Sequence, residues 1–142
     1  MAVLKRAKSA SRSARGAGER SGGAGASDGP GRAASATRLR EIRAALELNQ
    51  AGMARVLGVS VRTLSELENG DQPARPETHR RITEVARLHR ALSEIVSKRE
   101  LPGWMERPNV AFDGASPLHL IERGEIDRLW EMVYELRTGH PG

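Results

Sequence analysis

The chain has 142 residues, no cysteine and a formal charge of +5. This length allows one ordinary domain or two small helical ones, and the lack of cysteine excludes disulfides and thiolate zinc sites. No stretch approaches the ~20 apolar residues that a membrane-spanning helix needs, and the basic start lacks the apolar core of a signal peptide. We therefore expect a cytoplasmic protein with no membrane partner.

Residues 1–36 form a segment rich in Ala, Gly, Ser and Arg. It holds seven basic and two acidic residues, so it accounts for the whole formal charge of +5, and the rest of the chain is balanced. Apart from Met1, its only aliphatic residues larger than alanine are Val3 and Leu4. Such a segment cannot bury enough apolar surface to offset the entropy of ordering, so we predict a disordered tail. Its arginines would add non-specific, salt-sensitive affinity for DNA.

Residues 37–97 show helical periodicity and are predicted to form a first domain of four helices. The first helix has Thr37 as a possible N-cap, and the next two are predicted over 50–57 and 61–68. The fourth begins at Pro76 and has its apolar positions at Ile82, Val85, Leu88 or His89, Leu92, Ile95 and Val96.

Residues 98–142 are predicted to form a second, smaller helical unit. Ser116 before Pro117 is typical of a helix start, because serine caps the free amides and proline sits where no amide is needed. A last helix is expected over about 125–137, with an apolar stripe of Ile126, Leu129, Trp130, Val133 and Leu136. Phe112 and Trp130 are predicted to be core, whereas Trp104 fits either core or interface. No run has the period-2 alternation of a strand, so the predicted fold class is all-α.

The second and third predicted helices have the spacing of a helix-turn-helix unit. Ala54 is small enough for two helices to cross, and Gly58 permits the tight turn between them. The positions beneath the turn are apolar: Met53, Leu57, Val59, Leu64 and Leu67. A plain helical hairpin with the same packing is the alternative interpretation.

The residues left outside this predicted core favour DNA binding. Arg62 could contact guanine or a phosphate, Val61 a thymine methyl group, and Glu66 the amino group of cytosine. Helix N-termini favour phosphate, so Gln50 and Ser60, at the N-termini of the two predicted helices, are further candidates for DNA contact. The predicted DNA-binding set is Gln50, Ser60, Val61, Arg62, Ser65 and Glu66.

The residues from Leu48 to Ala54, 57–60 and 64–70 resemble the Xre-type helix-turn-helix family. In that family the Glu of the Glu-Asn-Gly segment commonly pairs with an arginine of the first helix. The resemblance therefore implies a structural pair between Arg43 and Glu68.

Residues 98–139 are similar to the toxin-binding domain of the Xre/MbcA/ParS antitoxins, in the stretches 104–109, 112–114 and 116–118 and in the final helix. The resemblance implies a type II antitoxin whose C-terminal end enters the active-site cleft of a toxin. The candidate toxin-binding residues are Trp104, Arg137, Thr138, Gly139 and His140.

The whole interpretation is an antitoxin that neutralises a cognate toxin and represses its own operon. The resemblance implies that the toxin is a RES-domain protein that degrades NAD. One recognition helix gives little specificity, so a homodimer on an inverted repeat of operator DNA is expected. We expect no enzyme, cofactor or metal site, because cysteine is absent and the four histidines are dispersed. Two alternatives stay open: a toxin-binding protein without DNA binding, and a solitary transcriptional repressor.

Overall fold

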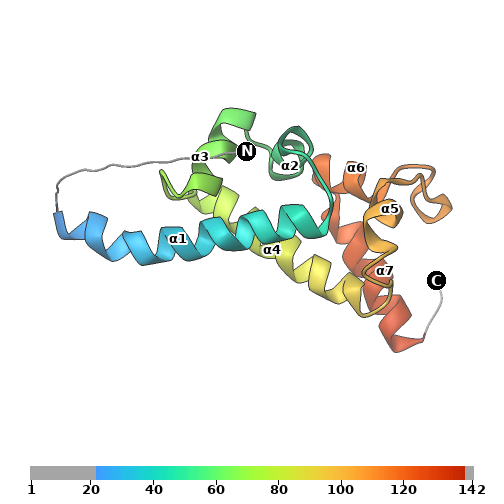
Figure 1. The fold of residues 1–142 in the computed structure, drawn as a ribbon. Helices are drawn as coiled ribbons and strands as arrows, with labels where there is room; N and C mark the ends of the chain where they lie inside the picture. The colour runs from blue at the N-terminus through green and yellow to red at the C-terminus, as the bar shows by residue number, and fades with distance from the viewer. Residues whose placement is uncertain (1–21, 140–142) are drawn as a thin grey trace.

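The computed structural model describes residues 22–139, and within this range every regular element is a helix. The predicted all-α class is confirmed (Figure 1). The elements in chain order are α1 (Gly22–Ala45), α2 (Gln50–Leu57), α3 (Val61–Asn69), α4 (Pro76–Ser93), α5 (Leu101–Glu106), the 3-10 helix η2 (Val110–Phe112), α6 (Pro117–Glu122) and α7 (Ile126–Thr138).

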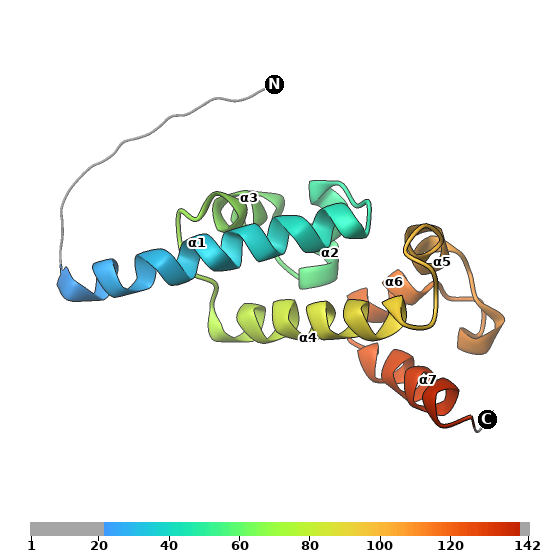
Figure 2. The ribbon, with the colours of Figure 1, turned by 60° about the horizontal axis from the view of Figure 1, so that its bottom comes forward.

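The helices form two groups joined by α4. Helix α3 packs against both α1 and α2, while α5, α6 and α7 gather near the C-terminal end of α4 (Figures 1 and 2). One continuous cluster of buried apolar side chains runs through both groups, so the expected domains 37–97 and 98–142 share a core. Its fully buried members include Leu39, Leu46, Met53, Leu64, Leu88, Leu92, Leu101, Leu120, Ile121 and Leu129.

The start of the first helix differs from the prediction. Helix α1 begins at Gly22, so Thr37 lies in the helix interior and caps nothing. Ala36 is 4% exposed, and its Cβ would lie 3.9 Å from a Cβ built on Gly70 at the end of α3. Small residues here let two backbones approach closely, a contribution that a search for large apolar residues misses. Residues 31–36, which the prediction placed in the disordered tail, therefore lie in α1, and residues 1–21 lie outside the described residues.

Local capping sets the starts of α2 and α3, whose predicted ranges were 50–57 and 61–68. The Asn49 side chain accepts a hydrogen bond from the Gly52 amide at 2.7 Å, and the Ser60 hydroxyl accepts one from the Thr63 amide at 3.0 Å. Gly58 follows α2 in the left-handed conformation, with φ of 72°, which glycine adopts without a Cβ penalty. These bonds satisfy amides that have no partner within a helix.

In α4 and the segment after it, the structure decides one alternative and corrects one prediction. Leu88 is buried and His89 only half-buried, so Leu88 is the core position. Helix α4 ends at Ser93, and Ile95 is exposed because the chain turns before the stripe can continue. The short helix α5, whose Leu101 and Met105 are buried, was not predicted.

The C-terminal helices confirm some predictions and correct others. Ser116 caps α6 by accepting from the His119 amide at 3.2 Å, and Phe112 is buried as predicted. Trp130 was expected in the core but is only half-buried, at its edge. Leu136, predicted on the buried stripe, is 53% exposed, because the last turn of α7 extends past the residues that the stripe packs against.

Candidate DNA-binding and partner-binding surfaces

The first half of α3 presents the most accessible of the predicted DNA-contacting side chains. The Arg62 side chain is 89% exposed, and Val61 and Ser60 are exposed beside it. Ser65 and Glu66, one turn further on, are half-buried. A recognition helix presents its N-terminal half to base edges, so this arrangement fits a helix that enters the major groove.

Glu66 is held by two neighbours. Its carboxylate accepts a hydrogen bond from the Gln72 amide nitrogen at 2.6 Å, and the Arg62 guanidinium lies 3.5 Å away. An exposed i,i+4 pair of this kind contributes about 0.3–0.5 kcal/mol, so Arg62 can leave it for a base or a phosphate at little cost. Glu66 would have to exchange its bond with Gln72 to accept from a base.

Glu68 is the centre of a buried polar network. The Arg43 Nε atom lies 2.6 Å from Glu68 Oε2, and Arg43 Nη2 lies 3.2 Å from Oε1, so the implied pair is present. The Gln50 amide nitrogen donates to the same carboxylate at 3.1 Å. This bond was not predicted, because nothing in the sequence indicates that residues 18 positions apart meet. It engages the Gln50 side chain, and a phosphate contact would fall to its backbone amide in the first turn of α2.

The predicted toxin-binding residues are divided between two helices. Arg137, Thr138 and Gly139 lie together at the end of α7, whereas Trp104 is half-buried on α5 and packs against the core. Arg137 donates to the Glu94 carboxylate at 2.6 Å, which ties the last turn of α7 to the end of α4. His140 lies outside the described residues.

Besides Ile95, three apolar side chains of the C-terminal half are exposed, and no feature of the sequence predicts it. Val110 is 94% exposed, Tyr134 is 70% exposed, and Leu136 is also exposed. The 3-10 helix η2, which carries Val110, is stabilised by an interaction at each of its ends. The Asn109 side chain accepts from the Ala111 amide at 2.9 Å, and Arg128 lies 3.3 Å from the Asp113 carboxylate.

Arg81 links the two groups of helices. Its Nη1 atom donates to the Val56 carbonyl oxygen at 2.8 Å and to the Ile121 carbonyl oxygen at 3.2 Å. These carbonyls lie in the last turns of α2 and α6, where a cation is favoured. An ion pair between Arg55 and Glu122, at 3.6 Å, crosses the same α2–α6 contact.

The ionisable groups do not assemble a reactive centre in the part of the chain that the structure describes. Burial, together with the nearby Lys98, lowers the pKa of His89, so this side chain is neutral at pH 7. No group of three or more His, Asp or Glu residues suited to a metal ion occurs within residues 22–139. In that range no helix is long and apolar enough to cross a membrane.

Comparisons with known proteins agree with this geometry. Residues 36–94 match a family model described as a helix-turn-helix domain. No curated protein matched the chain. Among solved structures, the chain is similar to one chain of the crystal structure of the M. tuberculosis MbcT–MbcA toxin–antitoxin complex, with a TM-score of 0.62.

That similarity covers 75% of this chain and 96% of the other at 20% sequence identity, a level at which the fold is what the two chains have in common. The helix-turn-helix match confirms the motif predicted from Ala54, Gly58 and the positions beneath the turn. The protein therefore carries a helix-turn-helix domain over residues 36–94 and shares its all-helical fold with a chain of a toxin–antitoxin complex.

Proposed function

We propose that this protein is the antitoxin of a type II toxin–antitoxin system, acting in the cytoplasm. It binds operator DNA with α3 and a cognate toxin with the surface formed by α5–α7. The observation that carries the proposal is a helix-turn-helix domain within a chain whose fold is similar to that of a chain from a toxin–antitoxin complex. The protein binds and regulates and is not an enzyme.

For the DNA half, support comes from the accessibility of the first turn of α3. Arg62, Val61 and Ser60 face solvent, and among the described residues Arg62 pairs with Glu66 alone, in a weak exposed ion pair. One helix reads few base pairs, so the proposed form is a homodimer on an inverted repeat that represses its own operon.

For the toxin half, support comes from exposed apolar side chains and from the exposed polar residues at the end of α7. The side chains of Val110 and Tyr134 are largely exposed to solvent. Aromatic and aliphatic residues are common at protein interfaces, where a partner covers them. The polar end, Arg137 to Gly139, is proposed to enter the cleft of the toxin. The toxin is proposed to be a RES-domain protein that degrades NAD, which rests on the resemblance of residues 98–139.

A toxin-binding protein without DNA binding is the second candidate. The balanced charge outside residues 1–36 favours it, because DNA-binding domains are commonly basic. The Arg62→Ala variant separates the two candidates. If Arg62 holds a guanine by two hydrogen bonds, operator affinity should fall by about 1–3 kcal/mol in a gel-shift titration, while toxin neutralisation is unchanged.

The matched control is Arg99→Ala, which removes an exposed arginine away from α3 and should leave operator affinity at the wild-type value. Equal operator binding by wild type and Arg62→Ala would show that α3 does not read DNA through this residue. No binding by the wild-type protein to its own promoter region would favour the second candidate.

Truncation after Leu136 tests the toxin half. The change removes residues 137–142 but keeps the buried stripe of α7, and it removes one exposed ion pair with Glu94, worth at most about 1 kcal/mol. Circular dichroism and operator binding should therefore match wild type. Growth of cells that co-express the toxin should fail.

A folded truncated protein that still protects cells fully would place the toxin interface elsewhere. The region from Trp104 to Pro117, which includes the exposed Val110, would then be the surface to change next. If cells are still protected by the truncated protein and by variants changed between Trp104 and Pro117, the proposed toxin-binding surface is contradicted.

A further inference from the structure

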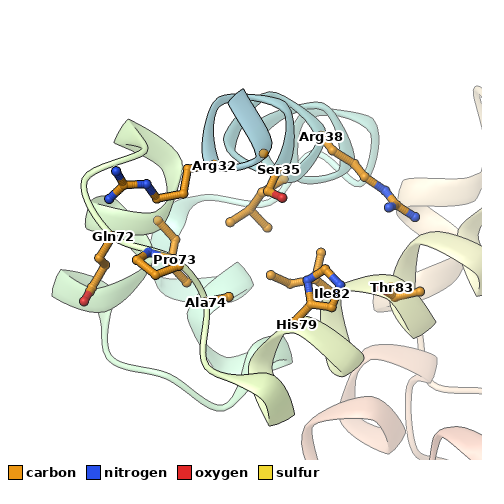
Figure 3. A pocket seen from close by; sticks show the side chains of 12 residues that line it. Arg32, Ser35, Arg38, Gln72, Pro73, Ala74, His79, Ile82 and Thr83 are labelled. Atoms are coloured by element: carbon orange, nitrogen blue, oxygen red, sulfur yellow. The ribbon is translucent and has the colours of Figure 1, made fainter. Parts of the chain in front are cut away.

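A cavity of about 270 Å³ lies between the middle of α1, the connection from α3 to α4, and the start of α4 (Figure 3). Arg32, Ser35 and Arg38 contribute from α1, and His79 and Thr83 from α4. None of the proposed DNA or toxin contacts lines it. It therefore needs an explanation of its own.

Among the described residues, the polar lining of the cavity is cationic or neutral. Arg32, Arg38 and His79 belong to it, and no described Asp or Glu does. The two arginines come from the same helix and lie at opposite ends of the cavity, Arg32 above Pro73 and Arg38 toward Thr83 (Figure 3). A concave wall with cations at both ends attracts an anion.

Arg32 supplies a buried donor that lacks an acceptor. Its Nε atom is buried and has no hydrogen-bond partner among the described residues. Its Nη1 atom makes one long bond, 3.5 Å, to the Asp71 carbonyl oxygen. A buried donor without an acceptor costs roughly 1–3 kcal/mol, a cost that a ligand oxygen would remove.

The remainder of the cavity wall is apolar. Leu39 and Ile82 are buried, and Pro73 lies across from them. A cavity of about 150 Å³ accommodates benzene, whereas pockets for larger ligands begin at about 300 Å³. The present volume therefore suits a single ring or a branched aliphatic group with one charged substituent.

We propose that this cavity binds a small organic anion, a carboxylate or a phosphate group carried on an apolar body about the size of a benzene ring. The anionic group accepts hydrogen bonds from Arg32, and the apolar body rests on Leu39 and Ile82. Gln72, which also lines the cavity, holds Glu66 of α3 at 2.6 Å. An occupant therefore contacts a residue that is bonded directly to the predicted recognition helix.

Titration of the full-length protein, followed by amide NMR shifts, tests the proposal. The probes are benzoate, phenyl phosphate and benzyl alcohol, the last being a neutral molecule of similar size. Benzoate or phenyl phosphate should give saturable shifts at the amides of Gln72, Ala74 and Thr83, and benzyl alcohol should bind at least tenfold more weakly. The stronger of the two anions identifies the carboxylate or the phosphate as the preferred group.

Three variants locate the site. Arg32→Gln should weaken the binding of the anion by about tenfold, because it removes one charge-assisted hydrogen bond. Ala74→Leu, which places a larger side chain in the cavity, should abolish binding. Arg90→Gln is the matched control, because this exposed arginine of α4 does not line the cavity, and its affinity should equal that of wild type.

Circular dichroism of each variant shows whether it is folded. If Ala74→Leu fails to fold, Arg32→Gln against Arg90→Gln still decides the question. The proposal is overturned if neither anion gives saturable shifts, if benzyl alcohol binds as tightly as the anions, or if folded Arg32→Gln keeps the wild-type affinity.

Discussion

At the scale of single residues, Glu68 shows how a charge is kept inside the domain. It is 3% exposed, and burying a carboxylate is costly unless donors surround it. Arg43 supplies two hydrogen bonds and Gln50 a third, while the Glu68 carbonyl accepts from Arg40. The network ties α1, α2 and the end of α3 together, so it orients the recognition helix rather than contacting DNA.

Replacing Arg43 should therefore destabilise the protein through the charge left behind. We expect Arg43→Leu to lower the free energy of unfolding by about 2 kcal/mol, below the about 3–5 kcal/mol of fully buried pairs, because Gln50 still donates to Glu68. Urea denaturation measures the change. Adding Glu68→Leu to Arg43→Leu should recover part of the loss, whereas Arg38→Leu, at an exposed arginine of α1, should cost little. No recovery in the double variant would contradict this explanation.

At the scale of elements, the turn between α2 and α3 depends on one backbone conformation. Gly58 has φ of 72°, and a Cβ built on it meets no atom within 4 Å. Any cost of substitution at this position is therefore backbone strain rather than a steric clash. Helix α1 shows the opposite situation, since its residues around Ala36 are ordered through contact with α3 rather than by a local cap.

Gly58→Ala should lower the free energy of unfolding by about 1–2 kcal/mol, which is the cost of the left-handed conformation for a residue with a Cβ. Gly58→Asn should cost less, because asparagine tolerates this conformation. Thermal or urea unfolding of the two variants, compared with wild type, checks the order. Equal losses for Ala and Asn would indicate a packing effect in place of backbone strain.

At the scale of the whole molecule, Arg81 and the continuous core make one folding unit of the two predicted domains. The guanidinium donates to carbonyls of α2 and α6, which are separated by more than sixty residues in the chain. The helix that carries it, α4, also packs against α1 and α7. We therefore expect that unfolding of one group of helices destabilises the other.

Arg81→Met should lower the stability of the whole chain by about 1–3 kcal/mol, because it removes two hydrogen bonds made by a charged donor. Unfolding should remain one transition, seen alike by far-ultraviolet circular dichroism and by the fluorescence of Trp104 and Trp130. Arg80→Met, at the exposed neighbouring position, is the control and should be near neutral. Two separate transitions in the wild-type protein would show that the groups fold independently.

The helix starts and the helix-turn-helix motif could be predicted from the sequence because they depend on local interactions. The bounds of α2, α3 and α6 follow from Asn49, Ser60 and Ser116, because a cap bonds to amides two or three residues away. The helix-turn-helix spacing is equally local, since it depends on Ala54 and Gly58 within one compact unit. The Arg43–Glu68 pair was reached by resemblance alone, because it joins residues that are distant in the chain.

Only the tertiary structure decided the features that depend on contacts between distant segments. The order of residues 31–36, the exposure of Leu136 and the double bond of Arg81 to α2 and α6 are set by which elements meet. So is the cationic cavity beside Arg32, whose lining comes from two helices and a connection. Periodicity shows which side of a helix is apolar, but it does not show how far the neighbouring helix extends to cover that side.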